Sequence, residues 1–349
     1  MTLLSPKRRL GNLLVTGGAG FIGSAFVRQR LREDDEVRIT VLDKLTYAGS
    51  EENLELIAKD SRLTFVRGDI CDAKVVDELA RDADVIVNFA AESHVDRSLL
   101  DAGDFVQTDV FGTYVLLEAA RRYQHRRFLQ VSTDEVYGDV RDGRSKEDDP
   151  LRPRSPYAAT KVGAEMLVNA YHVSFGLPTL ITRGSNTYGP YQFPEKIIPL
   201  FVTNALQGLP LPIYGDGSAV REYLHVDDHV DGIARVLRKG EPGKAYNLGA
   251  GTDTSGVQVA DTVLKLLDKP SSLKHFVKDR PGHDYRYAID NKRVRPLGWE
   301  PKVGFEQGMR TTIDWYRTHE DWWKRRKSAD FWEYYRKNYR GLPSGAVPL

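Results

Sequence analysis

A glycine-rich loop constrains the fold of this chain more than any other feature of its sequence. The segment VTGGAGFIGSAF places Gly18, Gly20 and Gly23 in the pattern GxGxxG, after the apolar run 13–17 and at the start of the amphipathic stretch 21–33. A strand, a tight turn and a helix in this order are typical of a unit whose backbone approaches a dinucleotide pyrophosphate at the helix N-terminus. The sequence therefore predicts a dinucleotide-binding fold, and the alternative is a glycine turn without a ligand.

Short apolar runs alternate with helical patterns through the first half of the chain. Repeated strand–helix–strand units favour parallel pairing with right-handed crossovers. We therefore predict an α/β protein with a Rossmann-like doubly wound parallel sheet. Its further strands are expected at 38–43, 63–69, 85–91 and 127–133.

The second half is richer in Pro and Gly, in stretches such as GLPLPIYGDG and DRPGHD, which indicates irregular loops. We expect the dinucleotide-binding domain over 11–188 and a smaller C-terminal substrate-binding domain over 189–341. The segment 223–249, with a predicted strand and helix, is expected to return to the first sheet.

The composition of the 349-residue chain limits the kinds of partner that it can bind. Its formal net charge is +1, so it lacks the general basic excess of a nucleic-acid-binding protein. Cys71 is the only cysteine, so neither an intrachain disulfide nor a thiolate metal cluster can form within one chain. The first residues lack the apolar core of a signal peptide, and no apolar run is long enough to span a bilayer. We expect a soluble cytoplasmic protein without nucleic-acid or membrane partners.

An acid after the second predicted strand selects the cofactor. Asp43 lies about twenty residues beyond the glycine loop, where a carboxylate accepts hydrogen bonds from a ribose 2′-OH and repels a 2′-phosphate. This favours NAD over NADP, although Lys44 adds a nearby positive charge. Gly17, together with Gly20 and Gly23, also fits a GxxGxxG pattern. Asp69, after the third strand, is expected either to reach the adenine edge or to cap the next helix.

Tyr157 and Lys161 lie four residues apart in SPYAATK, after a Ser-Pro pair that suits a helix start. A nearby ammonium lowers the pKa of a phenol, which can then accept a proton from an alcohol while hydride leaves the same carbon. The alternative is an ordinary surface pair. With the glycine loop, the pair resembles the extended short-chain dehydrogenase/reductase superfamily.

Thr133, Asp134 and Glu135 follow the apolar run that ends the predicted strand 127–133. Oxidising or epimerising a sugar alcohol does not need two adjacent acids. Loss of water from a 4-keto sugar does, because a base must remove the C5 proton and an acid must protonate the departing C6 hydroxyl. The alternative for the two acids is a capped turn after the strand.

The chain also resembles the dTDP-glucose 4,6-dehydratases from residue 14 to about 290. The matching stretches include LVTGGAGFIGS, NFAAESHVDRS, VSTDEVYG, SPYAATK, NTYGPYQFPEKIIPLF and YGDGSAVREYLHVDDH. The resemblance implies that Tyr157 is the base at the C4 hydroxyl, with Thr133 bonded to that oxygen, and that Glu135 removes the C5 proton. Asp134 would then protonate the C6 oxygen, and NAD would take hydride from C4 and return it to C6.

The resemblance also implies the remaining site residues and the assembly. Lys161 would hold the nicotinamide ribose, and the substrate would be dTDP-glucose. A homodimer is expected through two helices per subunit, one of which carries Tyr157. The cofactor residues would be Gly17, Gly20, Phe21, Ile22, Gly23, Asp43, Lys44, Thr46, Asp69, Ile70, Ala90, Ala91, Tyr157 and Lys161. The substrate residues would be Ser93, His94, Thr133, Asn186, Glu195, Lys196, Tyr214, Arg221, Asn247, Arg280 and His283.

HVDDH, residues 225–229, has two histidines at metal-ligand spacing, but we interpret Asp227 as a helix N-cap and expect no metal. The aromatic and basic C-terminal stretch is interpreted as a packed helix. Trp315, His319, Trp322 and Trp323 would face the domain, and the basic run 324–327 would be solvated.

Several positions depart from the usual pattern of the family and leave the nucleotide base open. They are Gly184, Thr187, Glu222, Tyr223 and His225. Three other functions remain as alternatives: a UDP-glucose 4,6-dehydratase, an NAD-dependent UDP-sugar epimerase or decarboxylase, and a non-catalytic NAD-binding regulator.

Overall fold

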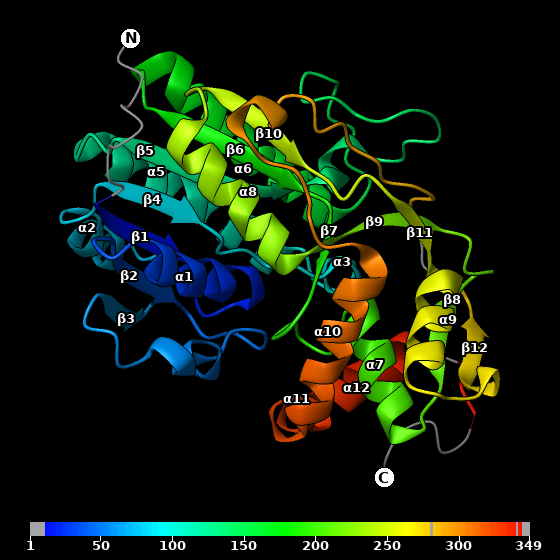
Figure 1. Cartoon of the computed structure of the whole chain (residues 1–349). Helices are drawn as coiled ribbons and strands as arrows, with labels where there is room; N and C mark the ends of the chain where they lie inside the picture. The colour runs from blue at the N-terminus through cyan, green and yellow to red at the C-terminus, as the bar shows by residue number, and fades with distance from the viewer. Residues whose placement is uncertain (1–10, 280–281, 340, 344–349) are drawn as a thin grey trace.

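The computed structural model describes residues 11–279, 282–339 and 341–343. Seven parallel strands form the main sheet, in the spatial order β10-β6-β5-β4-β1-β2-β3 (Figure 1). The chain adds β2 and β3 on one side of β1 and then adds β4, β5, β6 and β10 on the other side. This change in the order of strand addition is that of the predicted doubly wound sheet. The strands are β1 Asn12–Thr16, β2 Arg38–Asp43, β3 Leu63–Arg67, β4 Val85–Asn88, β5 Arg127–Thr133, β6 Thr179–Gly184 and β10 Lys244–Leu248.

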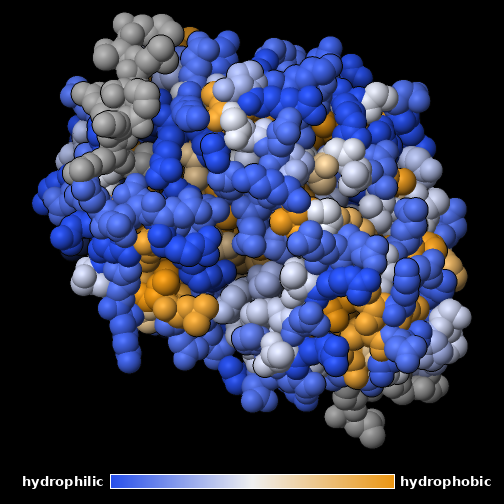
Figure 2. Space-filling view, viewed as in Figure 1, coloured by the Kyte–Doolittle hydropathy of each residue, from blue (hydrophilic) through white to orange (hydrophobic). Residues whose placement is uncertain are grey.

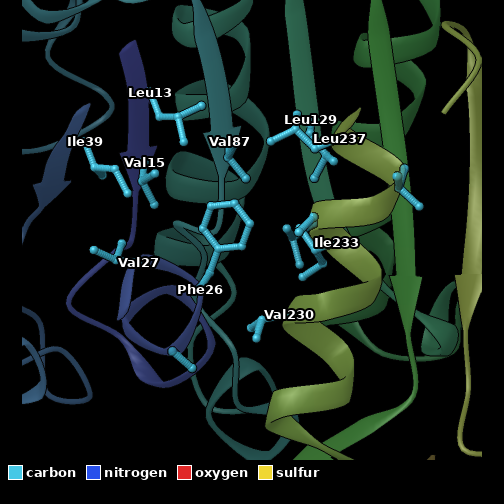
Figure 3. Packing of buried hydrophobic residues seen from close by; sticks show 14 of the residues in the cluster. Leu13, Val15, Phe26, Val27, Ile39, Val87, Leu129, Val230, Ile233 and Leu237 are labelled. Carbon is cyan, nitrogen blue, oxygen red and sulfur yellow. The ribbon is translucent and has the colours of Figure 1, made fainter. Parts of the chain in front are cut away.

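Helices cover both faces of this sheet. Helices α1 (Phe21–Glu33) and α8 (Val226–Lys239) pack on one face, and α2 (Ala73–Ala80), α5 (Thr113–Arg122) and α6 (Pro156–Phe175) pack on the other. Figure 3 shows Phe26 of α1 and Ile233 of α8 directed at strand residues such as Val87. All three side chains are fully buried, so the sheet is closed to water on this side.

Local sequence signals set the ends of helix α6, which carries Tyr157 and Lys161. Ser155 is its N-cap and accepts a hydrogen bond from the Ala158 N–H at 3.1 Å, and Pro156 occupies the first turn. Gly176 ends the helix with φ +69°, a conformation that favours glycine. The Ser-Pro start expected from the sequence is confirmed.

A second group of elements lies beside the main sheet and carries its own core (Figure 1). It holds the three-stranded sheet β11-β9-β7 and the pair β12-β8. Its strands are β7 Asn186–Tyr188, β8 Leu211–Tyr214, β9 Val220–His225, β11 Asp253–Ser255 and β12 Lys274–Val277. Its helices are α7 Ile197–Gln207, α9 Gly256–Leu266, α10 Phe305–Thr318, α11 Glu320–Arg326 and α12 Ala329–Asn338.

Short helical segments connect these elements. They are η1 Glu51–Ile57, α3 Val95–Ser98, α4 Gly103–Phe105, the π-helix η2 Val106–Gly112, η3 Asp134–Tyr137, η4 Ser271–Leu273 and η5 Arg295–Leu297. The face shown in Figure 2 is mostly hydrophilic, with separate hydrophobic patches. In the described part of the chain, no helix combines the length and apolar character needed to cross a membrane.

The segment 223–249 was expected to return to the main sheet, and its first strand does not do so. Strand β9 pairs with β7 and β11 instead of joining the main sheet, whereas α8 packs on the main sheet and β10 pairs with β6. The residue that caps α8 is His225, whose ring nitrogen accepts from the Asp227 N–H at 3.4 Å. The prediction of Asp227 as the N-cap was therefore wrong, and Asp227 lies in the first turn.

The C-terminal helices pack as expected, with exceptions at His319 and in the basic run. Trp322 and Trp323 are buried and Lys324 is exposed, but His319 is also exposed, with its ring stacked on that of Trp315, so the prediction that it faces the domain was wrong. Lys327 is buried instead of solvated, and its Nζ donates to the Asn204 and Gln207 side-chain oxygens at 2.7 and 2.9 Å. The two amide oxygens take the place of water around this ammonium group.

Candidate active site

Two connected cavities lie where the main sheet meets the second group of elements. The first, of about 300 Å³, runs from the glycine loop past the carboxyl ends of β2, β4 and β5. The second, of about 190 Å³, extends between β8, β9 and α7. Seven residues line both cavities: Ser93, Glu135, Asn186, Thr187, Gln192, Glu195 and Lys196. A ligand in one cavity can therefore meet a ligand in the other at Glu135.

The glycine loop forms part of the wall of the first cavity. Its backbone lies so close to neighbouring backbone atoms that larger residues would not fit at Gly17 and Gly23. Gly17 has φ +69°, and a Cβ there would lie 2.5 Å from the Ala90 nitrogen. A Cβ at Gly23 would lie 2.2 Å from the Gly17 oxygen. Gly17, Gly20 and Gly23 line the cavity, whereas Gly18 packs on Val41. The GxxGxxG spacing therefore describes the cavity better than GxGxxG.

Asp43 holds this loop and lines the same cavity. Its two carboxylate oxygens accept from the Ala19 and Leu45 N–H groups, each at 2.9 Å. Burial raises the pKa of Asp43, and the backbone hydrogen bonds oppose that shift.

Lys44 and Asp69 form an ion pair of 2.7 Å at the rim. Asp69 also accepts from the Cys71 N–H, while Asp72 is the residue that caps α2. Of the two alternatives for Asp69, capping the next helix is therefore wrong, and a contact to the adenine edge stays a prediction.

The geometry suits a bound dinucleotide. Several buried oxygen atoms in the first cavity have no hydrogen-bond partner among the described residues: Ser132 Oγ, Asp134 Oδ2, Ser185 Oγ and Asn186 Oδ1. Buried polar atoms of this kind are costly unless a ligand or water bonds them. All the predicted cofactor residues line this cavity, namely Gly17, Gly20, Phe21, Ile22, Gly23, Asp43, Lys44, Thr46, Asp69, Ile70, Ala90, Ala91, Tyr157 and Lys161.

Thr133, Asp134 and Glu135 turn from the end of β5 into the cavity as η3 begins. The Thr133 hydroxyl accepts from the Glu135 N–H at 3.2 Å and lies 3.2 Å from Asp134 Oδ1. Asp134 is 2% exposed, and burial, followed by the charges of Glu135 and Glu222, raises its pKa well above the usual value. Asp134 is thereby held as a carboxylic acid that can give up a proton.

Tyr157 and Lys161 project from α6 beside this triplet. Burial and the charges of Glu135 and Asp109 raise the pKa of the Tyr157 phenol well above its usual value. Lys161 Nζ donates to the Val131 carbonyl oxygen at 2.8 Å, and burial lowers the pKa of this amine. The expected lowering of the phenol pKa was therefore wrong, because burial and the nearby carboxylates raise it.

Most of the predicted substrate residues line the second cavity. They are Ser93, His94, Asn186, Glu195, Lys196, Tyr214, Arg221 and His283, while Thr133 lines the first. Asn247 lines neither cavity: it is fully buried, accepts from the Tyr137 hydroxyl at 2.8 Å and donates to the Ser145 carbonyl at 3.0 Å. Arg280 lies outside the described residues.

Two of the unusual positions fit together around a histidine. A Cβ at Gly184 would lie 2.4 Å from the His229 ring, so the ring occupies the space that a side chain at position 184 would need. His229 Nδ1 lies 2.7 Å from the Thr187 hydroxyl. His229 lines the first cavity and is 2% exposed, and burial lowers its pKa to about 4. The ring is therefore neutral at physiological pH.

Some residues of the site escaped sequence reasoning. Gln192 lines both cavities, and Tyr287 and Tyr339 line the second. Asp109, in the π-helix η2, accepts from the Glu92 N–H and the Thr160 hydroxyl, and burial raises its pKa to about 7. A single charged residue in the otherwise uncharged stretch 105–117 was the available signal for Asp109. Within the described ranges, no group of three His, Cys, Asp or Glu side chains is placed to hold a metal ion.

Comparisons with known proteins agree with this geometry. The family model described as GDP-mannose 4,6 dehydratase matches residues 14–312. The low-salt glycan biosynthesis protein Agl12 of Haloferax volcanii is 52% identical over 87% of this chain and 98% of its own length. A protein of Streptomyces niveus named dTDP-glucose 4,6-dehydratase is 47% identical over 91% of this chain and 96% of its own length.

A solved structure extends the match to three dimensions. DesIV from Streptomyces venezuelae, a dTDP-glucose 4,6-dehydratase solved with NAD and TYD bound, superposes with a TM-score of 0.89 at 49% identity. The match covers 90% of this chain and all of the other. The chain therefore belongs to the family described as GDP-mannose 4,6 dehydratase and, within it, to the dTDP-glucose 4,6-dehydratases of the extended short-chain dehydrogenase/reductase superfamily.

Proposed function

We propose that this protein is an NAD-dependent dTDP-glucose 4,6-dehydratase, which converts dTDP-glucose to dTDP-4-keto-6-deoxyglucose and water. The observation that carries the proposal is Glu135 at the junction of the two cavities, with Asp134, Thr133 and Tyr157 beside it in the first cavity. The names of the relatives and the ligands of DesIV support the same reaction and cofactor.

Each residue has a role in this reaction, and because the pKa of Tyr157 is raised, its phenol must lose its own proton before it can act as a base. NAD, when bound, supplies the hydride acceptor for C4 and the hydride donor for C6. Tyr157 accepts the proton of the C4 hydroxyl, whose oxygen Thr133 binds. Glu135 removes the C5 proton, and Asp134, held protonated by burial, delivers a proton to the departing C6 hydroxyl. Lys161, Asp43 and the glycine loop would hold the cofactor in the first cavity.

Two rival activities predict different products. An epimerase returns an isomer of unchanged mass and leaves two adjacent acids without a use, whereas a decarboxylase releases carbon dioxide. A UDP-glucose 4,6-dehydratase gives the same loss of water from a different nucleotide. The non-catalytic regulator is disfavoured by the presence of both Tyr157 and Lys161 in the first cavity.

Mass spectrometry of dTDP-glucose and, separately, UDP-glucose incubated with the purified protein tests the proposal. We expect dTDP-glucose to lose one water without added NAD, because a cofactor that ends each cycle oxidised can stay bound. Preference for UDP-glucose would move the assignment to the second dehydratase. An unchanged mass from both sugars, with NAD added, would contradict dehydration, and chromatography would then reveal an isomer.

A homodimer through α5 and α6 is part of the proposal. Phe111, Tyr114, Met166, Val173 and Phe175 are each more than 40% exposed on η2, α5 and α6. Large exposed apolar residues on neighbouring helices are typical of an interface. We expect twice the chain mass in sedimentation and a monomer for Met166→Glu/Val173→Glu. A monomeric wild-type protein would contradict the dimer.

The domain division near residue 188, the cytoplasmic location and the absence of nucleic-acid partners stay predictions from the sequence.

A further inference from the structure

Helix α11 packs in the second group of elements, yet it also contacts the half of the molecule that carries the glycine loop. The Trp322 indole Nε1 donates to Asn53 Oδ1 at 3.3 Å, and both side chains are buried. Arg325 and Arg326 donate to the two carboxylate oxygens of Glu52, each at 2.9 Å. Residues 52 and 53 are therefore held by a helix from the opposite end of the chain.

Asn53 also bonds the glycine loop. Its Nδ2 donates to the Ala19 carbonyl oxygen at 2.8 Å, and the Ser50 N–H donates to the same oxygen at 3.1 Å. On the other side of the residue, the Ala19 N–H donates to Asp43 at 2.9 Å. The two peptide groups of Ala19 are therefore fixed directly before Gly20, which lines the first cavity where α1 begins.

Two walls of the first cavity meet at residues 50–53. Thr46, Ala48 and Gly49 line this cavity, and residues 50–53 follow them directly in the chain. The glycine loop, which is the other wall, is bonded to the same four residues through Ala19. Because α11 contacts two of the four, its position bears on both walls.

Packing holds the Trp322 indole in place. Its ring centroid lies 5.0 Å from that of Trp315 and 5.9 Å from that of Tyr191, and the Arg326 guanidinium carbon lies 3.7 Å from its centre. The Arg28 guanidinium of α1 lies over the Tyr191 ring at 4.4 Å, which adds a second contact between the two halves. A ring enclosed in this way keeps its N–H directed at Asn53.

We propose that α11 anchors the walls of the cofactor cavity, with Trp322 and Asn53 as positioning residues for the glycine loop. The inference rests on the proposed function, in which NAD stays bound from one turnover to the next. Loss of the α11 contact should loosen both walls and speed the release of NAD. A contact that serves packing alone would lower the stability of the fold without changing that release.

Exchange of bound NAD with isotopically labelled NAD, followed by mass spectrometry of the purified protein, tests the proposal. We expect Trp322→Phe to exchange NAD about three- to tenfold faster than wild type, because one lost hydrogen bond lowers affinity by about that factor. The Kd for dTDP should stay within about twofold, since α11, all of whose residues the structure describes, does not line the second cavity. Glu52→Lys serves if Trp322→Phe does not fold: its site is partly exposed, it repels two arginines, and it should also speed exchange.

Trp323→Phe is the matched control. Trp323 is also buried on α11, but its Nε1 donates to the Tyr316 carbonyl at 2.8 Å, within the second group of elements. The control therefore loses a similar hydrogen bond and should exchange NAD at the wild-type rate. Equal acceleration in the two tryptophan variants, or an equal rise in the Kd for dTDP, would overturn the anchor.

The failure of this inference and that of the proposed function give different results. Wild-type protein that dehydrates dTDP-glucose, while Trp322→Phe or its substitute Glu52→Lys exchanges NAD at the wild-type rate, would overturn the anchor alone. Wild-type protein that binds no NAD would overturn the proposed function together with the anchor.

Discussion

Two acids that are neighbours in the chain occupy different surroundings. Asp134 is enclosed and kept protonated, whereas Glu135 is partly exposed and lines both cavities. Their different environments allow one to act as an acid while the other acts as a base.

Glu135→Gln should stop loss of water while C4 oxidation continues. The amide keeps the size of the side chain but cannot accept the C5 proton. We expect the rate of water loss to fall at least about a hundredfold, with accumulation of reduced cofactor absorbance after substrate is added. Glu78→Gln, an exposed acid on α2, is the control and should keep wild-type turnover. Full dehydration by Glu135→Gln would remove Glu135 from the mechanism.

Gly184→Ala should destabilise the protein through His229. The added Cβ would lie 2.4 Å from a ring that is also bonded to Thr187, so either the ring or the strand must shift. We expect a loss of about 1–3 kcal/mol in urea unfolding, and partial recovery in Gly184→Ala/His229→Ser. Gly256→Ala is the control, because its Cβ would meet nothing closer than 3.5 Å. Additive effects in the double variant would show that the two positions are independent.

Sequence reasoning located the residues that follow strands, because parallel strands end at the same edge of the sheet. It did not find Tyr339, which lies beyond the stretches that match the family, and it did not single out Gln192 and His229, although both lie within such stretches. Asn247 lies next to the end of β10, yet its amide is used inside the fold. Which side a side chain takes at a strand end depends on packing that a single sequence does not reveal.

At the scale of elements, α6 is tied to the sheet by a buried ion pair. Arg183 of β6 donates from Nη2 to Glu165 of α6 at 2.6 Å, and from Nη1 to the Tyr137 hydroxyl at 2.7 Å. Glu165 is fully buried and Arg183 is 5% exposed. The pair fixes the helix that carries Tyr157 and Lys161.

Glu165→Leu should destabilise the fold by about 3–5 kcal/mol, because it leaves the Arg183 charge buried without its partner. Glu165→Leu/Arg183→Met should recover part of that loss, since it removes both charges. Urea unfolding monitored by fluorescence gives the comparison. A double variant less stable than the single one would contradict this account of the pair.

The helix ends were predictable where cap residues are local, as with Ser155 and Pro156 of α6. The sheet membership of β9 was not, because an apolar strand followed by a helix has the same pattern whichever neighbours it pairs with. The cap of α8 was misassigned for a related reason: His225 reaches the Asp227 N–H only because β9 runs directly into the helix.

At the scale of the whole molecule, buried histidines couple folding to pH. Burial lowers the pKa of His94 and His229 from 6.5 to about 4. Between these pH values the unfolded chain binds protons at both positions and the folded chain does not. Their contribution to the free energy of unfolding is therefore present above pH 6.5 and is lost as the pH falls towards 4, by up to about 3 kcal/mol each.

His229→Phe isolates one of these contributions. Asp109, whose pKa is raised to about 7, acts in the opposite direction, so the wild-type curve alone is a sum. The variant removes the titration and keeps a ring over Gly184. We expect its stability relative to wild type to rise as the pH falls from 7 to 4.5 in urea unfolding. Parallel pH dependence of the two proteins would show that His229 does not titrate in this range.

The path of the chain has a consequence for how the molecule can be divided. After β9 in the smaller sheet, the chain forms α8 and β10 of the main sheet before it re-enters the smaller sheet as β11. A fragment ending at residue 188 would therefore lack Val230, Ile233 and Leu237, which bury one face of the sheet. The second group of elements therefore cannot be expressed or transferred to another protein as one continuous segment of the chain. Because the chain crosses the junction repeatedly, closure over a ligand is expected to occur by small sliding movements rather than by swinging about a single hinge.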